Sequence, residues 1–119
     1  MTPFAAASPD VPRATPFAAA SHELLGEGDG VSEGRMLHNP GLRSGNGKFF
    51  GFQRKGDVVV KLPEARVRAL IAGGEGSVMD RGQPDRPLRE WVSLRPPDAA
   101  SCLAYLREAR AFVDPDAAS

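Results

Sequence analysis

Lys61 is the residue whose type and setting most readily indicate a binding chemistry. It lies on an expected strand between the apolar residues Val60 and Leu62, and strand alternation turns it to the opposite face from both. Three further candidates come from other expected strands or their ends: Arg35, Lys48 and Trp91. Cations edged by an aromatic ring can hold an anion or a nucleic-acid backbone, so we predict a binding surface at these four positions. The alternative is a solvated face on which the lysines prevent association through the sheet edges, with the Trp91 indole buried in the core.

The glycine-rich segment 41–48, GLRSGNGK, looks like a phosphate-binding loop but lacks its required positions. The loop needs a glycine five residues before Gly47, where this chain has Leu42, and a hydroxyl residue after the lysine, where Phe49 stands. The segment also leads into an expected strand, so no helix N-terminus is available to hold a phosphate. A G-x-G-x-x-G match fails as well, because Phe50 occupies the third glycine position. We interpret the segment as a turn.

No set of residues in the chain has the spacing of a catalytic or metal site. A zinc site would need His22, His38 and Cys102 to converge, and none of them has a partner at ligand spacing. Cys102 lies on the apolar side of an expected helix, which favours an inert buried thiol over a nucleophile. Asp85 and Glu90 could be imagined as an acid pair, but nothing in the pattern positions them. We therefore predict no catalytic residue, no metal and no cofactor.

The composition is that of one ordinary globular domain. The chain has 119 residues, of which 41% are hydrophobic and 25% charged, and its formal net charge is zero. Segment 35–112 carries fourteen basic and eight acidic residues, so the expected folded body is mildly basic and could attract an anionic partner. The alternative, which we favour, is a solvated surface of mixed charge. The single cysteine suits a reducing compartment. No apolar stretch approaches about 20 residues, so we expect a soluble cytoplasmic protein without a membrane contact.

Segment 47–62, GKFFGFQRKGDVVVKL, predicts the hairpin around which the fold is built. Two apolar runs, 49–52 and 58–60, flank a polar break that contains Gly56. Alternation predicts one shared face for Lys48, Phe50 and Phe52. On the return strand it predicts one shared face for Val58, Val60 and Leu62. A hairpin alone is marginal in water, so flanking helices must cover it.

The heptamer TPFAAAS occurs twice, at 2–8 and at 15–21. The second copy predicts a helix start, because Thr15 can cap it and a proline follows at the first helical position. The first copy runs into two further prolines, so we expect a flexible arm at 1–14 and a domain at 15–113. Docking of the arm through Phe4 is the alternative.

The remaining expected elements complete an α+β domain with an antiparallel sheet and helices packed against it, in the order α-β-β-β-α-β-β-α. They are an edge strand at 31–37, a turn at 39–41, a helix that begins at 63–64 and stops at 73–74, strands at 75–80 and 88–94, a helix from its Asp98 cap to Val113, and a disordered tail at 114–119.

With these elements placed, the chain resembles the TfoX N-terminal domain family over residues 16–113. The resemblance rests on the order and spacing of short segments: GRML at 34–37, GL at 41–42, GKFFGF at 47–52, VVKLP at 59–63, AGGE at 72–75, PLREWV at 87–92 and the helix end at 109–113. It implies the fold of the wider MmcQ/YjbR-like set, an antiparallel sheet backed by helices. Founding members are linked to the regulation of natural competence and are not known as enzymes. The family supplies no catalytic residues to carry over.

Three functions remain open from the sequence. The leading hypothesis is a small, stand-alone, non-enzymatic domain that binds a protein partner in a regulatory setting through a basic patch around Arg35, Lys48 and Lys61. The second is a DNA-binding protein of the MmcQ/YjbR type, and the third is a small-ligand binder or enzyme with a cleft near Trp91. The family resemblance and the expected edge strands also point to a homodimer.

Overall fold

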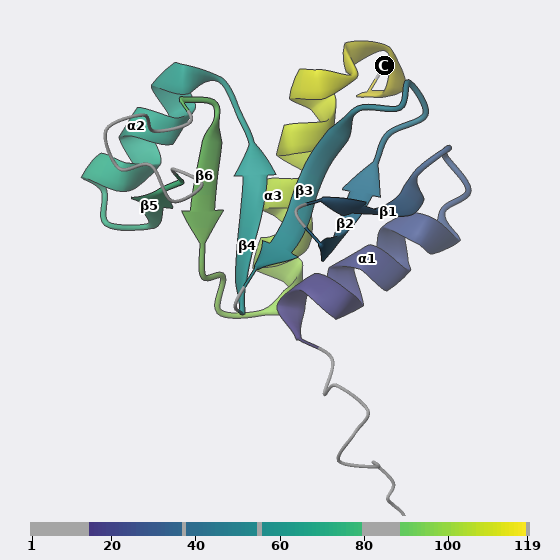
Figure 1. Cartoon of the computed structure of the whole chain (residues 1–119), viewed down its shortest axis with the longest axis horizontal. Coiled ribbons are helices and arrows are strands. Elements are labelled where there is room, and N and C mark those ends of the chain that lie inside the picture. Colours follow the sequence, from purple (N-terminus) through teal and green to yellow (C-terminus); the bar gives the residue numbers. More distant parts are fainter. Residues whose placement is uncertain (1–14, 37, 55, 80–88, 119) are drawn as a thin grey trace, which may run out of the picture.

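The computed structural model describes residues 15–36, 38–54, 56–79 and 89–118. These residues form an α+β domain of three helices, a six-stranded sheet and a short 3₁₀ helix, η1 (Figure 1). In chain order the elements are α1 (Pro16–Gly26), β1 (Ser32–Met36), β2 (Asn39–Arg43), β3 (Phe49–Arg54), β4 (Asp57–Lys61), α2 (Glu64–Ala72), β5 (Gly76–Val78), β6 (Trp91–Leu94), α3 (Ala99–Val113) and η1 (Pro115–Ala118). The predicted fold class is confirmed. The expected arm at 1–14 lies outside the described residues.

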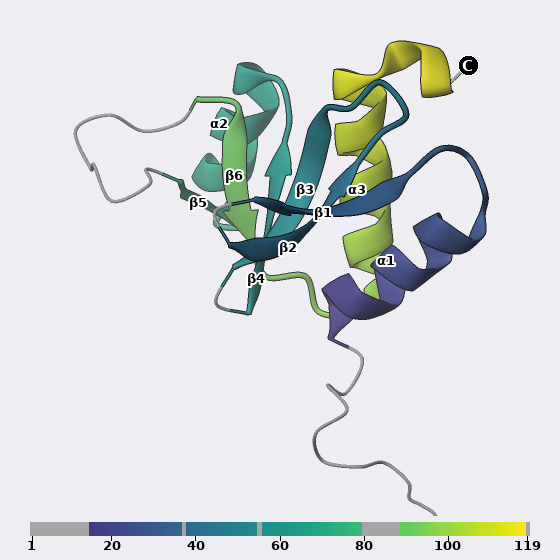
Figure 2. The same cartoon turned by 45° about the vertical axis from the view of Figure 1, so that its right-hand side comes forward.

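The sheet has the strand order β1-β2-β3-β4-β6-β5, and every neighbouring pair is antiparallel (Figure 2). It contains one strand more than predicted. Segment 39–41, Asn-Pro-Gly, was expected to be a turn but opens β2, and His38 before it adopts a positive φ of 67°. Proline has no backbone N–H to donate. Pro40 is tolerated here because the pairing of β2 with β3 begins only at the next residue, Gly41.

The helices begin where the capping residues predict. The Thr15 hydroxyl accepts a hydrogen bond from the Ala18 N–H at 3.0 Å, and the Asp98 carboxylate accepts one from the Ser101 N–H at 2.8 Å. α2 follows Pro63 directly and ends at the predicted glycine pair. No helix in the described part of the chain is long and apolar enough to cross a membrane.

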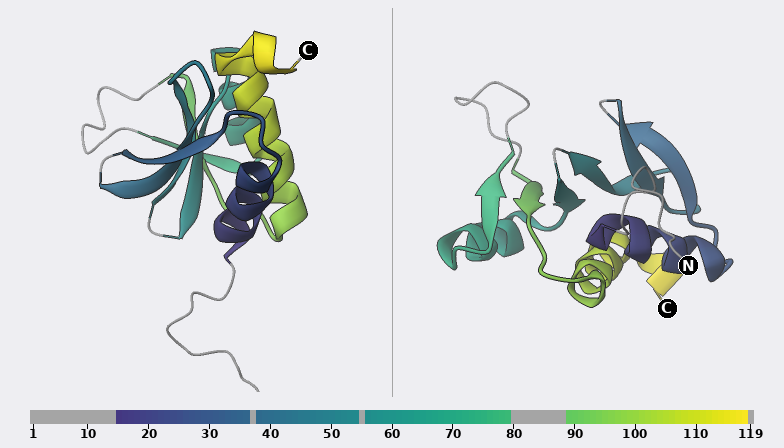
Figure 3. Two further views of the ribbon diagram at one scale, coloured as in Figure 1. Left: turned by 90° about the vertical axis from the view of Figure 1, so that its right-hand side faces the viewer. Right: turned by 90° about the horizontal axis from the view of Figure 1, so that it is seen from below.

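The main core lies between one face of the sheet and the three helices, which all lie on the same side (Figure 3). The predicted stripe of Val58, Val60 and Leu62 faces this core and is almost fully buried. The helices contribute Phe17, Ala20, Leu24, Val67, Leu70, Cys102, Leu106, Ala109 and Val113.

A bulge in β3 overturns the expectation that Phe50 and Phe52 share a face. Leu42 of β2 pairs with Gly51 and the next residue, Arg43, pairs with Phe49, so Phe50 is an extra residue in β3. Phe50 is therefore turned into the main core, whereas Phe52 packs on the opposite side of the sheet. Simple alternation cannot anticipate this, because one inserted residue exchanges the faces of all the residues beyond it.

The described residues include 114–118, which belong to the tail expected at 114–119. Asp114 is buried and accepts a hydrogen bond from the Ser44 hydroxyl at 2.6 Å, and the same hydroxyl accepts one from Arg110 Nε at 3.0 Å. η1 follows directly. The hydrogen bonds tie the end of α3 to the turn between β2 and β3.

Candidate binding surface

The two faces of the sheet differ in what covers them. One face packs against the helices and forms the main core. The other face carries a second, smaller hydrophobic cluster, to which no helix contributes a residue. This second cluster consists of Phe52, Val59 and Met79, which are buried, with Met36 and Trp91 packed against them. We call this side of the sheet, which the described helices leave uncovered, the open face.

Lys61 and Trp91 form a cation–aromatic pair on the open face. The two residues are opposite each other in the β4–β6 register, and Lys61 Nζ lies 5.7 Å from the centre of the indole ring. The Phe52 ring meets the indole edge-on, with 5.6 Å between the ring centres. Glu90 Oε1 lies 3.9 Å from Lys61 Nζ, and the two side chains are 34% and 48% exposed for Lys61 and Glu90, so this ion pair is weak. The ammonium group thus remains available at the border of an aromatic surface.

Arg43 and Phe49 form a second pair of the same kind. They are opposite each other in the β2–β3 register, and the guanidinium carbon lies 5.6 Å from the centre of the ring. Gly34 and Gly41 make room for this ring, because a Cβ would lie 2.9 Å from a ring carbon at Gly34 and 3.2 Å from one at Gly41. The phenyl ring therefore lies across the backbone of the β1–β2 hairpin.

The open face carries more positive than negative charge. Arg54 Nη1 contacts Met79 Sδ at 3.2 Å, which places this guanidinium beside the second cluster. Asp57 accepts hydrogen bonds from Arg95 at 2.9 Å and from the Ser93 hydroxyl at 3.2 Å, so its charge is already matched. Among the described residues no carboxylate pairs with Arg43 or Arg54. An anionic group of a partner could therefore be accommodated here.

The structure brings together two of the four residues predicted from the sequence, Lys61 and Trp91. Lys48 is exposed on the other side of the sheet. Its carbonyl accepts a hydrogen bond from the Ser44 N–H, which makes the two residues a pair, and the Ser44 side chain points toward α3. Since paired residues share a face, Lys48 faces the helix side.

Arg35 is also separated from the Lys61–Trp91 pair. Its neighbour Met36 packs on the open face, so alternation along β1 turns Arg35 to the helix side. Its guanidinium is exposed and donates to the His38 carbonyl at 3.4 Å. The predicted four-residue surface is thus divided between two faces of the sheet.

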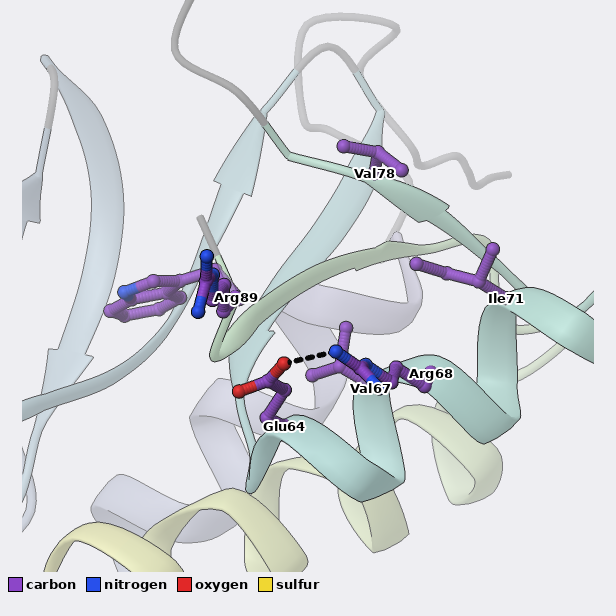
Figure 4. A pocket seen from close by; sticks show the side chains of 7 residues that line it. Glu64, Val67, Arg68, Ile71, Val78 and Arg89 are labelled. Carbon is purple, nitrogen blue, oxygen red and sulfur yellow. Dashed lines mark hydrogen bonds and ion pairs between the residues drawn. The ribbon is translucent and has the colours of Figure 1, made fainter. Parts of the chain in front are cut away.

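A groove of roughly 280 Å³ lies beside Trp91, where the sequence suggested a cleft (Figure 4). It runs between α2 and the end of the sheet formed by β5 and β6. Its lining consists of Glu64, Val67, Arg68, Ile71, Val78, Arg89 and Trp91. The indole therefore borders both this groove and the open face.

The other chemistry considered from the sequence finds no support in the described residues. No group of His, Cys, Asp and Glu within them could hold a metal ion. Burial raises the pKa of Cys102 to about 12, so the thiol stays protonated. Of the segment 41–48 that was predicted to be a turn, residues 41–43 belong to β2. Only 44–48 form the turn, in which the Gly47 N–H donates to the Ser44 carbonyl. Asp85 lies outside the described residues, so the imagined acid pair with Glu90 is not seen.

Sequence reasoning missed Arg43, Phe49 and Arg54 as members of the open face. The sequence placed Phe49 in the hairpin but did not identify Arg43 as its cross-strand partner. The alternation of apolar and polar residues does not show the bulge at Phe50 that brings the two together. The signal that could have found it is the pair of glycines in neighbouring strands, Gly34 and Gly41, which leaves a space for a large ring.

Comparison of the chain with protein-family models and with curated proteins found no match, and comparison of its structure with solved structures found none either.

Proposed function

We propose that this chain is a non-enzymatic binding domain that recognises a protein partner through its open face. The observation that supports the proposal is the pair of cation–aromatic contacts, Arg43–Phe49 and Lys61–Trp91, on the side of the sheet that the described helices leave uncovered. Aromatic and Arg side chains are enriched at protein interfaces, and charges at the rim steer the encounter. The partner segment that fits this surface is acidic and carries apolar side chains.

The rings favour a protein partner over a single-stranded nucleic acid. Proteins that bind single strands present aromatic faces on which bases stack. Here Lys61 covers the indole and Arg43 covers the Phe49 ring, whose other neighbours are the backbone at Gly34 and Gly41. The chain as a whole has no net charge. The surface is therefore better suited to ion pairs with carboxylates of a protein partner than to the stacking of bases on its rings.

A pair of charge-reversal variants tests the proposal. Arg43→Glu combined with Lys61→Glu alters the open face, whereas Arg35→Glu combined with Lys48→Glu makes the same change of net charge on the helix side. We expect the amount of captured partner to fall by at least about tenfold for the first variant, because its new carboxylates would face the acidic partner. The second variant should capture as much partner as the unchanged protein. Quantitative mass spectrometry of affinity captures from the protein's own cells measures both. Equal loss in the two variants would reject the open face as the contact surface.

The second candidate is a DNA-binding protein of the MmcQ/YjbR type, and the surplus of positive charge on the open face favours it. Phosphate binding releases counterions, so the affinity for duplex DNA would fall steeply with salt. Fluorescence anisotropy with a generic duplex across a salt series measures this. If no binding occurs even at low salt, this candidate is eliminated, and a steep slope that Arg43→Glu reduces would replace the protein-partner proposal.

We further propose a regulatory role in the cytoplasm and a homodimeric state. The resemblance to the TfoX N-terminal domain family stays a prediction. The edge strands β1 and β5 each pair on one side only within the described residues, which leaves an edge for self-association. Sedimentation equilibrium tests the dimer, and a purely monomeric mass at micromolar concentration would exclude it.

A further inference from the structure

The groove beside Trp91 is separate from the open face except for the indole itself. Figure 4 shows Glu64, Val67, Arg68 and Ile71 rising from α2, with Arg89 across from them and Val78 on β5. β5 ends at Val78, which pairs with Val92, so β6 continues to Trp91 without a β5 neighbour. This step at the edge of the sheet creates the space.

The aliphatic part of the groove is formed by Val67 and Ile71 of α2 and by Val78 of β5. Val67 is buried in the main core and Ile71 packs against that core. Val78 is 53% exposed and is the only large hydrophobic side chain with such exposure among the described residues. An apolar body in the groove would bury this side chain and part of the indole, which is favourable because apolar surface leaves water.

The two guanidinium groups of the groove differ in their partners. Arg68 Nη2 donates to Glu64 Oε2 at 2.7 Å, so these charges neutralise each other. Arg89 forms no ion pair with any described residue and is exposed. The groove therefore combines aliphatic walls with one cation that has no counter-charge in this part of the structure.

We propose that this groove binds a small amphiphilic carboxylate of the medium-chain fatty acid class. The aliphatic chain lies on Val67, Ile71, Val78 and the indole, and the carboxylate contacts Arg89. Octanoate has a matching size, because its ten non-hydrogen atoms, at ~30 Å³ each, occupy about 300 Å³, close to the groove volume of roughly 280 Å³. The inference goes beyond the proposed partner binding, since it concerns another surface and another class of ligand.

Trp91 is the only tryptophan in the chain, so its fluorescence reports on the groove directly. We expect a saturable change on titration with octanoate below its micelle concentration. Octanol and octylammonium have the same apolar chain without the negative charge, and both should bind at least about threefold more weakly. A response that does not saturate, or equal affinities for octanoate and octylammonium, would overturn the proposal.

Three variants locate the site. We expect Arg89→Gln to weaken octanoate by about three- to tenfold while leaving octanol unchanged, because only the carboxylate uses the guanidinium. Val78→Ser removes exposed apolar surface without disturbing the core and should weaken both ligands. Arg35→Gln, which removes a cation at the opposite edge of the sheet, should change neither. If Arg89→Gln and Arg35→Gln have the same effect, the carboxylate is not bound in this groove.

The proposal for the groove and the proposal for the open face can be rejected independently of each other. Arg43→Glu alters only the open face and should leave the octanoate titration unchanged, whatever it does to partner capture. Amide shift changes in a ¹H–¹⁵N spectrum with octanoate should concentrate in α2, β5 and β6. Changes confined to β1, β2 and β3 would place the ligand elsewhere and contradict the groove.

Discussion

Gly51 shows how tightly one residue can be held in this fold. A Cβ at this position would overlap the Cδ2 atom of Leu106 on α3, whose side chain is fully buried. The absence of a side chain at Gly51 lets α3 approach β3 at the position next to the bulge. The contact is one of close packing, because Gly51 is not among the glycines with a positive φ.

We therefore expect Gly51→Ala to destabilise the domain by about 1–3 kcal/mol, the usual cost of overpacking a core. Urea denaturation measures the change in the free energy of unfolding. In a Leu106→Ala background the added methyl group should cost much less, because the side chain that it meets has been shortened. Additive effects of the two substitutions would contradict the close approach.

Cys102 is expected to be chemically inert in the folded protein. Its side chain is fully buried, and burial raises the pKa of the thiol to about 12, so almost no thiolate exists at pH 8. A thiol-specific disulfide reagent at pH 8 should label the native protein far more slowly than the protein in denaturant. Labelling of the native protein at the unfolded rate would show that the thiol is accessible.

Much of the residue-scale structure could be predicted from the sequence where the signal is local. The caps at Thr15 and Asp98 follow from side chains that bind backbone groups three residues on. Alternation predicted the face on which Lys61 lies, but its position opposite Trp91 follows from the β4–β6 pairing, which was not predicted from the sequence. Alternation alone could not predict the pair of Arg43 and Phe49, because the pair depends on a bulge that the alternation does not show.

At the scale of elements, α3 is anchored at its C-terminal end by polar contacts. Arg110 is buried and donates to Ser44 Oγ and to the Asp29 carbonyl, and Arg107 binds the Glu27 carboxylate. These contacts join α3 to the β2–β3 turn and to the loop after α1. The Glu27 pKa is lowered by the hydrogen bond from Arg107, so this contact favours the folded state above the ordinary carboxylate pKa and is lost as the pH falls below it.

Removal of Asp114 should loosen this anchor. Asp114→Ala leaves the buried Ser44 hydroxyl without its acceptor, which we expect to cost about 1–3 kcal/mol in the free energy of unfolding. Glu33→Ala, an exposed change on β1, serves as the control and should stay within about 0.5 kcal/mol. Denaturant melts of both variants measure the difference. Equal stabilities would mean that the chain end contributes nothing to the fold.

The helices were easier to predict than the strands for a physical reason. A helix is specified by neighbours in sequence, whereas a strand depends on its partners. The Asn-Pro-Gly signal at 39–41 is typical of a turn, yet it opens β2, because the chain reverses at His38 just before it. The hydrogen bond of Asp114 could not be predicted from the local pattern, because its donor lies seventy positions away in the sequence.

At the scale of the whole molecule, the helices lie on one side of the sheet and the surplus of positive charge lies on the other. The chain has no net charge, so this surplus is local. We expect affinity for a protein partner to weaken between low and physiological salt, since the charges at such a rim are screened. Surface plasmon resonance with a captured partner measures this dependence. An affinity unchanged by salt would argue against an acidic contact.

Lysine footprinting of the complex tests the open face most directly. Lys61 lies on the open face and Lys48 on the helix side, so the two amines serve as probe and internal control in one chain. Acetylation followed by mass spectrometry compares their labelling in the free and partner-bound protein. If the partner binds the open face, Lys61 is protected and Lys48 is labelled as before. Protection of Lys48 with Lys61 unchanged would contradict the proposed surface.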